Sequence, residues 1–452
     1  MLYYLLRLLF RVANRFYFRT FQVKGVENIP EKGPVFFVAN HPSAFMDPIV
    51  IATITNRRLF FLAKGALFEG RFAQWILPKF NMIPIFRSSE TPGQGKKNKE
   101  IFSICYKHLA KGGAILAFPE GISVTERKLK KIQSGTARIC LGAEAENNFA
   151  LDLKIITVGL NFSDPHTFYS DAFINVDQAI HVSDFYEAYK QDPFKGAHAL
   201  TDEIRRHLET QVVAIEDAEE DKLVARIEAI YKSQLLLELG QSPKEMADDF
   251  NTTKRIRDSV RHFKATEPKR VQEFKKEIET YLHQIERLKL NDKHIKGVGS
   301  ASPALDAIKS AFYLLLGLPF FFFGFLNNYL PFRLPFWAAT LITRRPDFFG
   351  SIALTMGTFA FLLFYALQIW LVNMYFSDWR ITLGYAITLP ISGLFAFFYY
   401  RRFKDLRGKW RIFSLFYRKT QYVAALISKR QHIVDELTRG KDDFIKHNNP
   451  IT

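Results

Sequence analysis

The chain has 452 residues, of which 48% are hydrophobic and 15% aromatic, and its formal net charge is +17. This length suits two or more domains, and the charge predicts a polyanionic partner, either nucleic acid or an anionic membrane surface. The apolar segments in the C-terminal third favour the membrane, and no nucleic-acid-binding motif occurs. With only Cys105 and Cys140, the sequence excludes a disulfide framework and a zinc site.

Residues 1–21 form the first predicted element, an amphipathic helix. Its arginines recur every four residues and therefore share one helical face: Arg7, Arg11, Arg15 and Arg19. They interrupt the apolar run too early for a membrane span, and no signal-peptide cleavage site follows. We therefore expect an interfacial helix lying in the membrane plane, with its arginines at lipid phosphates. A helix packed on the protein's own domain is the alternative.

Residues 22–200 predict an α/β domain, with a central mixed sheet flanked by helices. Short apolar runs typical of buried strands occur at 35–39, 59–62, 114–118 and 154–160. Helical patterns lie between them, around 98–111 and 136–147. Residues 201–296 are polar with helical periodicity and predict a helical arm, and the composition of 297–310 predicts a linker.

Residues 311–400 predict a membrane region. The segments 351–372 and 381–400 carry no charge and are each about as long as a helix that crosses a hydrocarbon core. They predict a two-span hairpin. The segment 311–326 is shorter and contains Pro319, so we expect it to be re-entrant or interfacial, with a third span as the alternative.

Basic residues flank this region on both sides and continue into a basic tail, residues 401–452. Positively charged flanks favour the cytoplasmic side of a membrane. We therefore expect an integral membrane protein whose catalytic domain and tail lie on the cytoplasmic face, as in a bacterial inner membrane.

A histidine and an aspartate on one short segment are the strongest chemical signal. His41 and Asp47 lie in Asn-His-Pro-Ser-Ala-Phe-Met-Asp-Pro, with five residues between them. A straight helix would turn them onto different faces, but Pro42 and Pro48 permit a turn that brings them together. A neutral imidazole oriented by a carboxylate is a general base that can deprotonate a hydroxyl group.

The order of four motifs across residues 25–165 resembles the phospholipid/glycerol acyltransferases. The segment with His41 and Asp47 resembles their first motif, residues 83–87 their second and Phe118-Pro119-Glu120-Gly121 their third, while 155–160 occupies the place of the fourth. The resemblance implies that His41 is the general base, that Asp47 orients it, and that Glu120 belongs to the catalytic site. It also implies that Arg87 and Gly121 bind a phosphate-bearing acceptor.

Two departures from the family pattern refine this expectation. Five residues rather than four separate His41 and Asp47, and Ile122-Ser123 stands where Thr-Arg usually follows the third motif. A customary phosphate-binding arginine is therefore absent, and the residues that could replace it are Arg127, Lys128, Lys131 and Arg138. The Phe-Pro-Glu-Gly-x-Ser form, which brings Ser123 into the expected binding site, resembles the fungal-type glycerol-3-phosphate/dihydroxyacetone-phosphate acyltransferases and their bacterial relatives.

The expected reaction is transfer of a fatty acyl group from acyl-CoA or acyl carrier protein to glycerol-3-phosphate or dihydroxyacetone phosphate. The expected partners are the bilayer, the acyl donor and the phosphorylated acceptor, with no nucleic acid, no metal and no cofactor. Acylation of lysophosphatidic acid is one alternative. A non-catalytic lipid-binding protein on the same fold is the other.

Overall fold

The computed structural model describes residues 1–86, 97–296 and 303–448. It divides into two compact units. The α/β unit comprises residues 1–216 and 335–358, and the helical unit comprises 217–334 and 359–452. The α/β unit therefore extends beyond the predicted limits of 22 and 200, and it includes a segment from the predicted membrane region.

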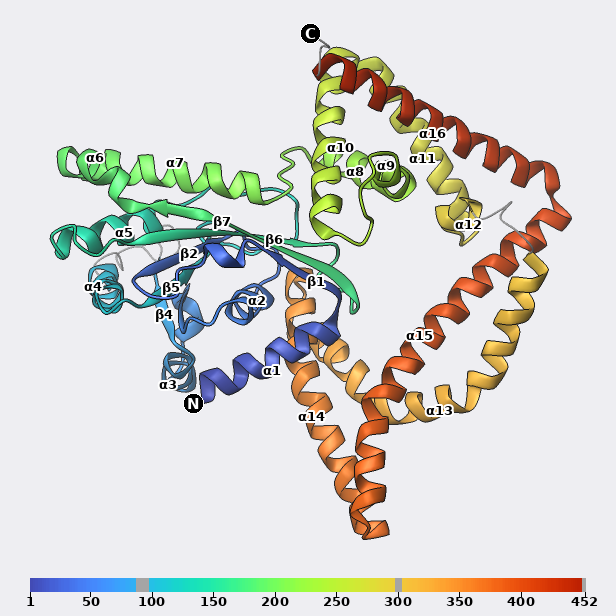
Figure 1. Cartoon of the computed structure of the whole chain (residues 1–452), viewed down its shortest axis with the longest axis horizontal. Helices are drawn as coiled ribbons and strands as arrows, with labels where there is room; N and C mark the ends of the chain where they lie inside the picture. The colour runs from blue at the N-terminus through green and yellow to red at the C-terminus, as the bar shows by residue number, and fades with distance from the viewer. Residues whose placement is uncertain (87–96, 297–302, 449–452) are drawn as a thin grey trace. The chain divides into compact units, whose positions relative to one another are not determined.

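The α/β unit is built on one seven-stranded sheet (Figure 1), with strand order β1-β7-β6-β2-β5-β3-β4. Neighbouring strands run parallel except β6 and β7, so the sheet is mixed, as predicted. The strands are β1 (Phe18–Lys24), β2 (Val35–Ala39), β3 (Leu59–Lys64), β4 (Met82–Ile85), β5 (Ala114–Ala117), β6 (Lys154–Phe162) and β7 (Ser170–His181).

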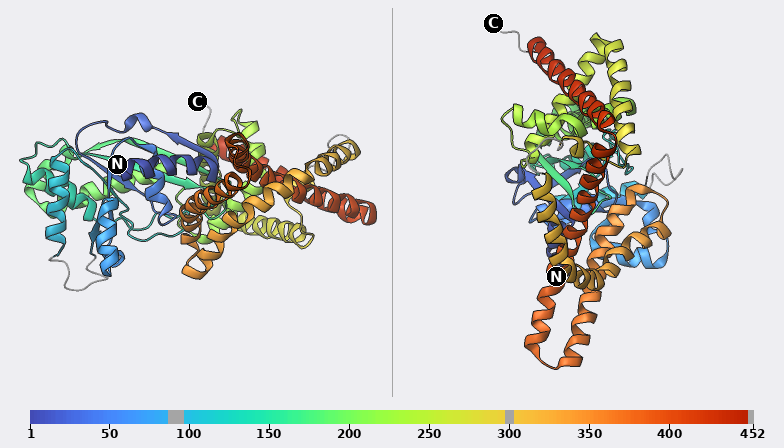
Figure 2. Two further views of the ribbon diagram at one scale, coloured as in Figure 1. Left: turned by 90° about the horizontal axis from the view of Figure 1, so that it is seen from below. Right: turned by 90° about the vertical axis from the view of Figure 1, so that its right-hand side faces the viewer.

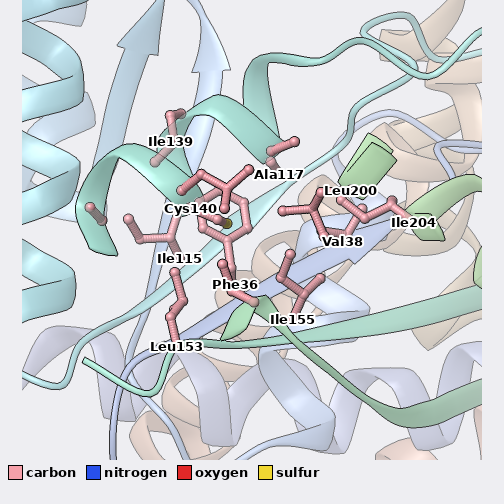
Figure 3. Close-up of a cluster of buried hydrophobic side chains, with 14 of the residues drawn as sticks. Phe36, Val38, Ile115, Ala117, Ile139, Cys140, Leu153, Ile155, Leu200 and Ile204 are labelled. Atoms are coloured by element: carbon pink, nitrogen blue, oxygen red, sulfur yellow. The ribbon is translucent and has the colours of Figure 1, made fainter. Parts of the chain in front are cut away.

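The helices of the α/β unit cover both faces of this sheet. They are α1 (Leu2–Tyr17), α2 (Met46–Ile54), α3 (Arg71–Ile76), α4 (Lys97–Ala110), α5 (Gly135–Glu146), α6 (Tyr186–Gln191) and α7 (Pro193–Gln211). On β2, alternate side chains point to opposite faces. Phe36 and Val38 join a core with α4, α5 and α7 (Figure 3), whereas Phe37 joins one with α1 and α2.

The sequence predicted the central strands and two helices well. The run at 35–39 is β2, the other three runs correspond to β3, β5 and β6, and the helical patterns correspond to α4 and α5. The predicted domain limit at residue 200 is wrong because α7 continues to Gln211. Its buried side chains on both sides of that limit belong to one core: Leu200, Ile204 and Leu208.

The N-terminal helix differs from its prediction. It ends at Tyr17, and the residues that follow form β1. Two of its arginines bind the protein itself: Arg7 donates to the Asn56 carbonyl at 2.8 Å, and Arg11 donates to the Thr53 carbonyl at 3.0 Å. The exposed side chains include large apolar ones, namely Leu5, Leu8, Val12 and Phe16. That the helix lies at a membrane interface stays a prediction. The face that would contact the lipid is this apolar one, not the face that carries the arginines.

The helical unit contains the predicted arm from residue 217 onward and most of the apolar helices. Its first part consists of α8 (Ala218–Ile227), α9 (Ser233–Glu238), α10 (Met246–Thr266), α11 (Pro268–Arg287) and α12 (Asp292–Lys296). Four longer helices follow, and two of them also contribute residues to the α/β unit: α13 (Pro303–Ile342), α14 (Phe349–Phe376), α15 (Trp379–Arg418) and α16 (Thr420–Asn448).

In the part of the chain that the structure describes, three helices are long and apolar enough to cross a membrane. The candidate spans are Lys309–Ile342, Pro346–Phe376 and Trp379–Ile412. The last two form a hairpin whose orange helices run side by side in Figures 1 and 2. The predicted limits of the short segment 311–326 are therefore wrong, because α13 continues through Pro319 to Ile342. Residues 303–310 of the predicted linker also belong to α13.

Two adjacent asparagines, Asn327 and Asn328, interrupt the apolar sequence of α13, but the helix continues through them. The Asn328 amide donates to the carbonyl group of Leu389 at 3.2 Å and accepts from the Tyr365 hydroxyl at 2.6 Å. Asn327 accepts from the Tyr385 hydroxyl at 2.6 Å. Since partners on α14 and α15 satisfy these amides, they do not need to end the helix.

Candidate active site

The first and third motifs meet because they follow neighbouring parallel strands. Val38 on β2 pairs with Ala117 on β5, near the carboxyl ends of both strands. His41 follows β2 after one intervening residue, and Glu120 follows β5 within the next turn. Residues at the carboxyl ends of adjacent parallel strands share one edge of the sheet, where such sheets commonly bind ligands.

The structure brings the side chains of His41 and Asp47 together. His41 Nδ1 lies 2.7 Å from Asp47 Oδ2, and the Ser43 N–H donates to the same oxygen at 2.8 Å. Asp47 is fully buried, whereas the His41 side chain keeps 19% of its surface exposed. The carboxylate therefore holds a proton on Nδ1 and leaves Nε2 as the nitrogen that can accept one.

A tight turn brings these two residues together despite their spacing. The Met46 N–H donates to the Ser43 carbonyl at 2.9 Å, and Ala44 between them has a φ of 37°. This left-handed conformation is strained for alanine. The chain then enters α2, so Asp47 lies in the first helical turn, where a negative charge is favourable.

Burial controls the charge of the aspartate. Loss of hydration raises the pKa of the Asp47 carboxyl, and the hydrogen bonds from His41 and the Ser43 N–H oppose that rise. These two hydrogen bonds keep Asp47 ionised, and the ionised carboxylate in turn stabilises the positive charge of a protonated His41. The dyad is thus suited to holding a proton temporarily on His41.

The imidazole also has an aromatic support. The rings of His41 and Phe118 are stacked, with centroids 4.1 Å apart and an angle of 15° between their planes. Another histidine–carboxylate cluster lacks a free nitrogen: His207 has Asp177 at Nδ1 and Glu203 at Nε2, at 2.8 and 3.1 Å. Among the described residues, His41 Nε2 has no such partner, which suits a base rather than a structural histidine.

Both carboxylate oxygens of Glu120 accept hydrogen bonds from the backbone, and its membership of the catalytic site stays a prediction. Its Oε1 accepts from the His41 N–H at 3.0 Å, and its Oε2 accepts from the Lys130 N–H at 3.1 Å. Burial raises the pKa of this carboxyl, and the two N–H groups oppose the rise. Because both oxygens bind backbone, Glu120 positions the segment that carries His41.

The residues next to Glu120 shape the same loop. Gly121 has a φ of 76°, which favours glycine, and its N–H donates to the Phe118 carbonyl at 3.0 Å. The hydroxyl of Ser123 accepts from the Ala44 N–H at 2.7 Å. Ser123 thus stabilises the strained turn, and substrate contacts by Gly121 and Ser123 stay predictions.

The expected acceptor-binding cations differ in their surroundings. Arg87 lies outside the described residues. Lys128 pairs with Glu216 at 3.1 Å, and the Arg138 guanidinium lies over an aromatic ring, 5.8 Å from the centroid of Phe102. Within 1–86, 97–296 and 303–448, no hydrogen bond or ion pair joins Arg138 or the exposed Lys131 to His41, so the binding roles of both cations stay predictions.

Two residues that the sequence analysis missed also contact this site. Ser351 contacts the turn through Ser43 and Met46, and Arg345 Nη2 donates to the Ser123 carbonyl at 3.0 Å. Both come from the α/β unit's second segment, residues 335–358. No local pattern connects positions 222 to 308 residues apart, so sequence spacing offered no signal for them.

Comparisons with known proteins agree with this site. Residues 20–161, which include both members of the dyad, match the family model described as Acyltransferase. Glycerol-3-phosphate O-acyltransferase 1 of Saccharomyces cerevisiae is 28% identical over 142 residues, which cover 31% of this chain and 19% of that protein. The chain thus matches about a fifth of the yeast protein's length.

A solved structure is also similar in part. The crystal structure of the 1-acyl-sn-glycerophosphate (LPA) acyltransferase PlsC from Thermotoga maritima is 16% identical, with a TM-score of 0.33, and the match covers 46% of this chain and 79% of that one. The family match and the yeast relative agree in naming acyl transfer. Residues 20–161 are therefore similar to the acyltransferase family and to part of the yeast enzyme.

Proposed function

We propose that this protein transfers a fatty acyl group from acyl-CoA or acyl carrier protein to the hydroxyl group of glycerol-3-phosphate or dihydroxyacetone phosphate. The observation that carries the proposal is the buried Asp47 bound to His41 Nδ1, with Nε2 left as the base. The likeness to the yeast glycerol-3-phosphate O-acyltransferase supports the choice of acceptor. The intact dyad also favours an enzyme over a lipid-binding protein.

The reaction proceeds by direct attack of the acceptor. His41 Nε2 removes the hydroxyl proton as the oxygen attacks the thioester carbonyl, and Asp47 stabilises the resulting imidazolium. The tetrahedral intermediate then collapses, breaks the carbon–sulfur bond and forms the ester. The leaving thiolate takes the proton from His41, which gives a free thiol and restores the neutral imidazole. No enzyme nucleophile is required.

The membrane helices support a location next to the lipid product. Basic residues flank the hairpin at both ends: Arg344 and Arg345 precede α14, while Arg401, Arg402 and Lys404 lie within α15 after its apolar part. Positive flanks favour the cytoplasmic face. This charge pattern supports a cytoplasmic acyltransferase domain, and a bacterial inner membrane is part of the proposal.

A donor and acceptor panel tests the function. Purified full-length protein in detergent is incubated with labelled acyl-CoA or acyl carrier protein and with glycerol-3-phosphate, dihydroxyacetone phosphate or lysophosphatidic acid. We expect transfer to one of the first two acceptors and none in His41→Ala. Preference for lysophosphatidic acid would replace the acceptor assignment. Transfer that persists in His41→Ala would contradict the mechanism, and inactivity with every acceptor would favour the lipid-binding alternative.

A further inference from the structure

We infer that residues 345–351, which end in the first turn of α14, are part of the active site, and that Ser351 positions the turn between His41 and Asp47. This inference rests on the proposed acyl transfer and adds a positioning residue to it. Ser351 is fully buried and belongs to the same compact unit as the turn. Its contribution comes from outside the acyltransferase motifs.

The hydroxyl group of Ser351 makes two hydrogen bonds to the backbone of the turn. It donates to the Ser43 carbonyl at 2.7 Å and accepts from the Met46 N–H at 3.0 Å. The same carbonyl and N–H also bind each other across the turn. Ser351 therefore bonds both ends of the connection that returns Asp47 to His41, which is the geometry on which the base depends.

A second contact holds the other side of the turn. Arg345 Nη2 donates to the Ser123 carbonyl at 3.0 Å, and the Ser123 hydroxyl accepts from the Ala44 N–H at 2.7 Å. The Arg345 side chain is itself fixed by Asp347, through bonds of 3.2 and 2.6 Å. Arg345 and Ser351 thus restrain the strained Ala44 from two directions.

Other hydroxyl groups on α14 show that this arrangement is specific to Ser351. Thr355 donates to the Ser351 carbonyl and Thr358 donates to the Leu354 carbonyl at 2.6 Å, each one turn earlier in the same helix. This local bond is usual for hydroxyl side chains inside helices. Ser351 instead directs its hydroxyl to the catalytic turn, so Thr358 provides a matched control.

The test compares Ser351→Ala with Thr358→Val in the full-length protein. We expect Ser351→Ala to lower kcat about 10- to 100-fold, because a small displacement of a catalytic group slows the reaction strongly, while the acceptor KM changes less than about threefold. Thr358→Val should keep wild-type kinetics. Arg345→Gln, at a side chain that is 59% exposed, is a second variant for which we expect a smaller fall in kcat.

A readout that does not require turnover separates this inference from the proposed function. Diethylpyrocarbonate modifies histidines, and peptide mass spectrometry measures its rate at His41. We expect a rate at least about twofold higher in Ser351→Ala, since a loosened turn frees the imidazole from Asp47. Thr358→Val should match the wild type. Thermal unfolding confirms that each compared variant is folded.

The outcomes for the two ideas are distinct. An active wild type with unchanged kcat and unchanged His41 modification in Ser351→Ala would overturn the positioning role and leave the proposed function intact. A wild type inactive towards every acceptor would overturn the function, and the modification rates would then decide the positioning role. If Ser351→Ala does not fold, Arg345→Gln decides by the same two measurements.

Discussion

The imidazole of His41 lies flat against the ring of Phe118, with ring centroids 4.1 Å apart. Phe118 belongs to the third motif and His41 to the first, so the stack joins the two motifs through side chains as well as backbone. Aromatic pairs of this kind contribute about 0.5–1.5 kcal/mol beyond their buried area. The stack restricts rotation of the imidazole without using either ring nitrogen.

Replacing Phe118 by leucine tests this support. We expect Phe118→Leu to lower kcat up to about tenfold, because the imidazole can tilt away from the acceptor, with little change in KM. Steady-state kinetics measure the effect. Phe118→Tyr, which keeps the ring, is the control and should retain most of the activity; equal losses in both variants would argue against a role for stacking.

Replacing Asp47 by asparagine should separate activity from stability. We expect Asp47→Asn to lower kcat about 100- to 10,000-fold, because an amide no longer enforces the correct imidazole tautomer. Burial raises the pKa of Asp47, so its ionisation opposes folding at neutral pH. The asparagine variant should therefore be at least as heat-stable as the wild type at pH 7.

The sign of the pH dependence follows from the same raised pKa. As the pH falls from 7 through the folded-state pKa towards the ordinary aspartate value of about 4, Asp47 becomes protonated and the folding penalty disappears. The stability advantage of Asp47→Asn should shrink over that window. Thermal unfolding midpoints at several pH values measure it, and an advantage that grows on acidification would contradict the assigned burial effect.

Two buried glutamates allow a matched test of Glu120. Glu144 also accepts from two backbone N–H groups, those of Leu151 and Leu153, at 3.1 and 2.7 Å. We expect glutamine at either position to reduce the free energy of unfolding by about 1–3 kcal/mol, through loss of an acceptor. Only Glu120→Gln should also lower kcat, because its partner is His41. Unfolding and kinetics together distinguish the two.

Gly350, in the first turn of α14, lies directly against the backbone of Pro165. A Cβ atom there would lie 1.9 Å from the Pro165 carbonyl oxygen, whereas one at Gly384 would meet nothing within 4 Å. We expect Gly350→Ala to displace the first turn of α14, reducing stability by about 1–3 kcal/mol and lowering kcat. Gly384→Ala should leave both unchanged or slightly raise stability. Normal kinetics in Gly350→Ala would contradict the expected displacement.

The contacts of Ser351 also predict the membrane topology. If α13 crossed the bilayer between Lys309 and Ile342, Ser351 would emerge opposite the domain whose turn it contacts. The intervening arm contains no candidate span among its described residues. We therefore expect α13 not to cross, and α14 and α15 to form the two-span hairpin.

Cysteine labelling in membrane vesicles measures this topology. The native thiols of Cys105 and Cys140 are buried, which limits background reaction. With a membrane-impermeant maleimide, Arg344→Cys and Lys446→Cys should react from the face that carries the acyltransferase domain, and Ser377→Cys from the other face. Reaction of Arg344→Cys from the face opposite the acyltransferase domain, with Ser377→Cys reacting from the domain's own face, would show that α13 spans the membrane.

Local pattern explains which parts of the fold the sequence predicted. The apolar run at 35–39 carries enough signal to identify β2, because both faces of that strand are buried. β1 was missed because its aromatic residues continue the amphipathic pattern of α1. The limits of α13 were missed because a proline and two asparagines mimic a helix end, although neighbouring helices satisfy the asparagines.

In the candidate site too, residues of a local motif could be predicted, whereas contacts between distant segments could not. His41 and Asp47 could be singled out because their motif is local, and their side chains meet in the structure. The backbone-binding role of Glu120 requires knowledge of how β2 and β5 pair, which the motif alone does not contain. Ser351 could not be found, since a hydroxyl in an apolar helix has no distinguishing sequence pattern.

The distance along the chain between Met46 and Ser351, 305 residues, has a consequence for biosynthesis. At about 5–20 residues per second, a ribosome needs roughly 15–60 s to travel from one to the other. All the acyltransferase motifs are made early in that interval, yet the catalytic turn gains its last support only as α14 is synthesised. The nascent domain would then remain poorly active until its membrane hairpin begins to emerge.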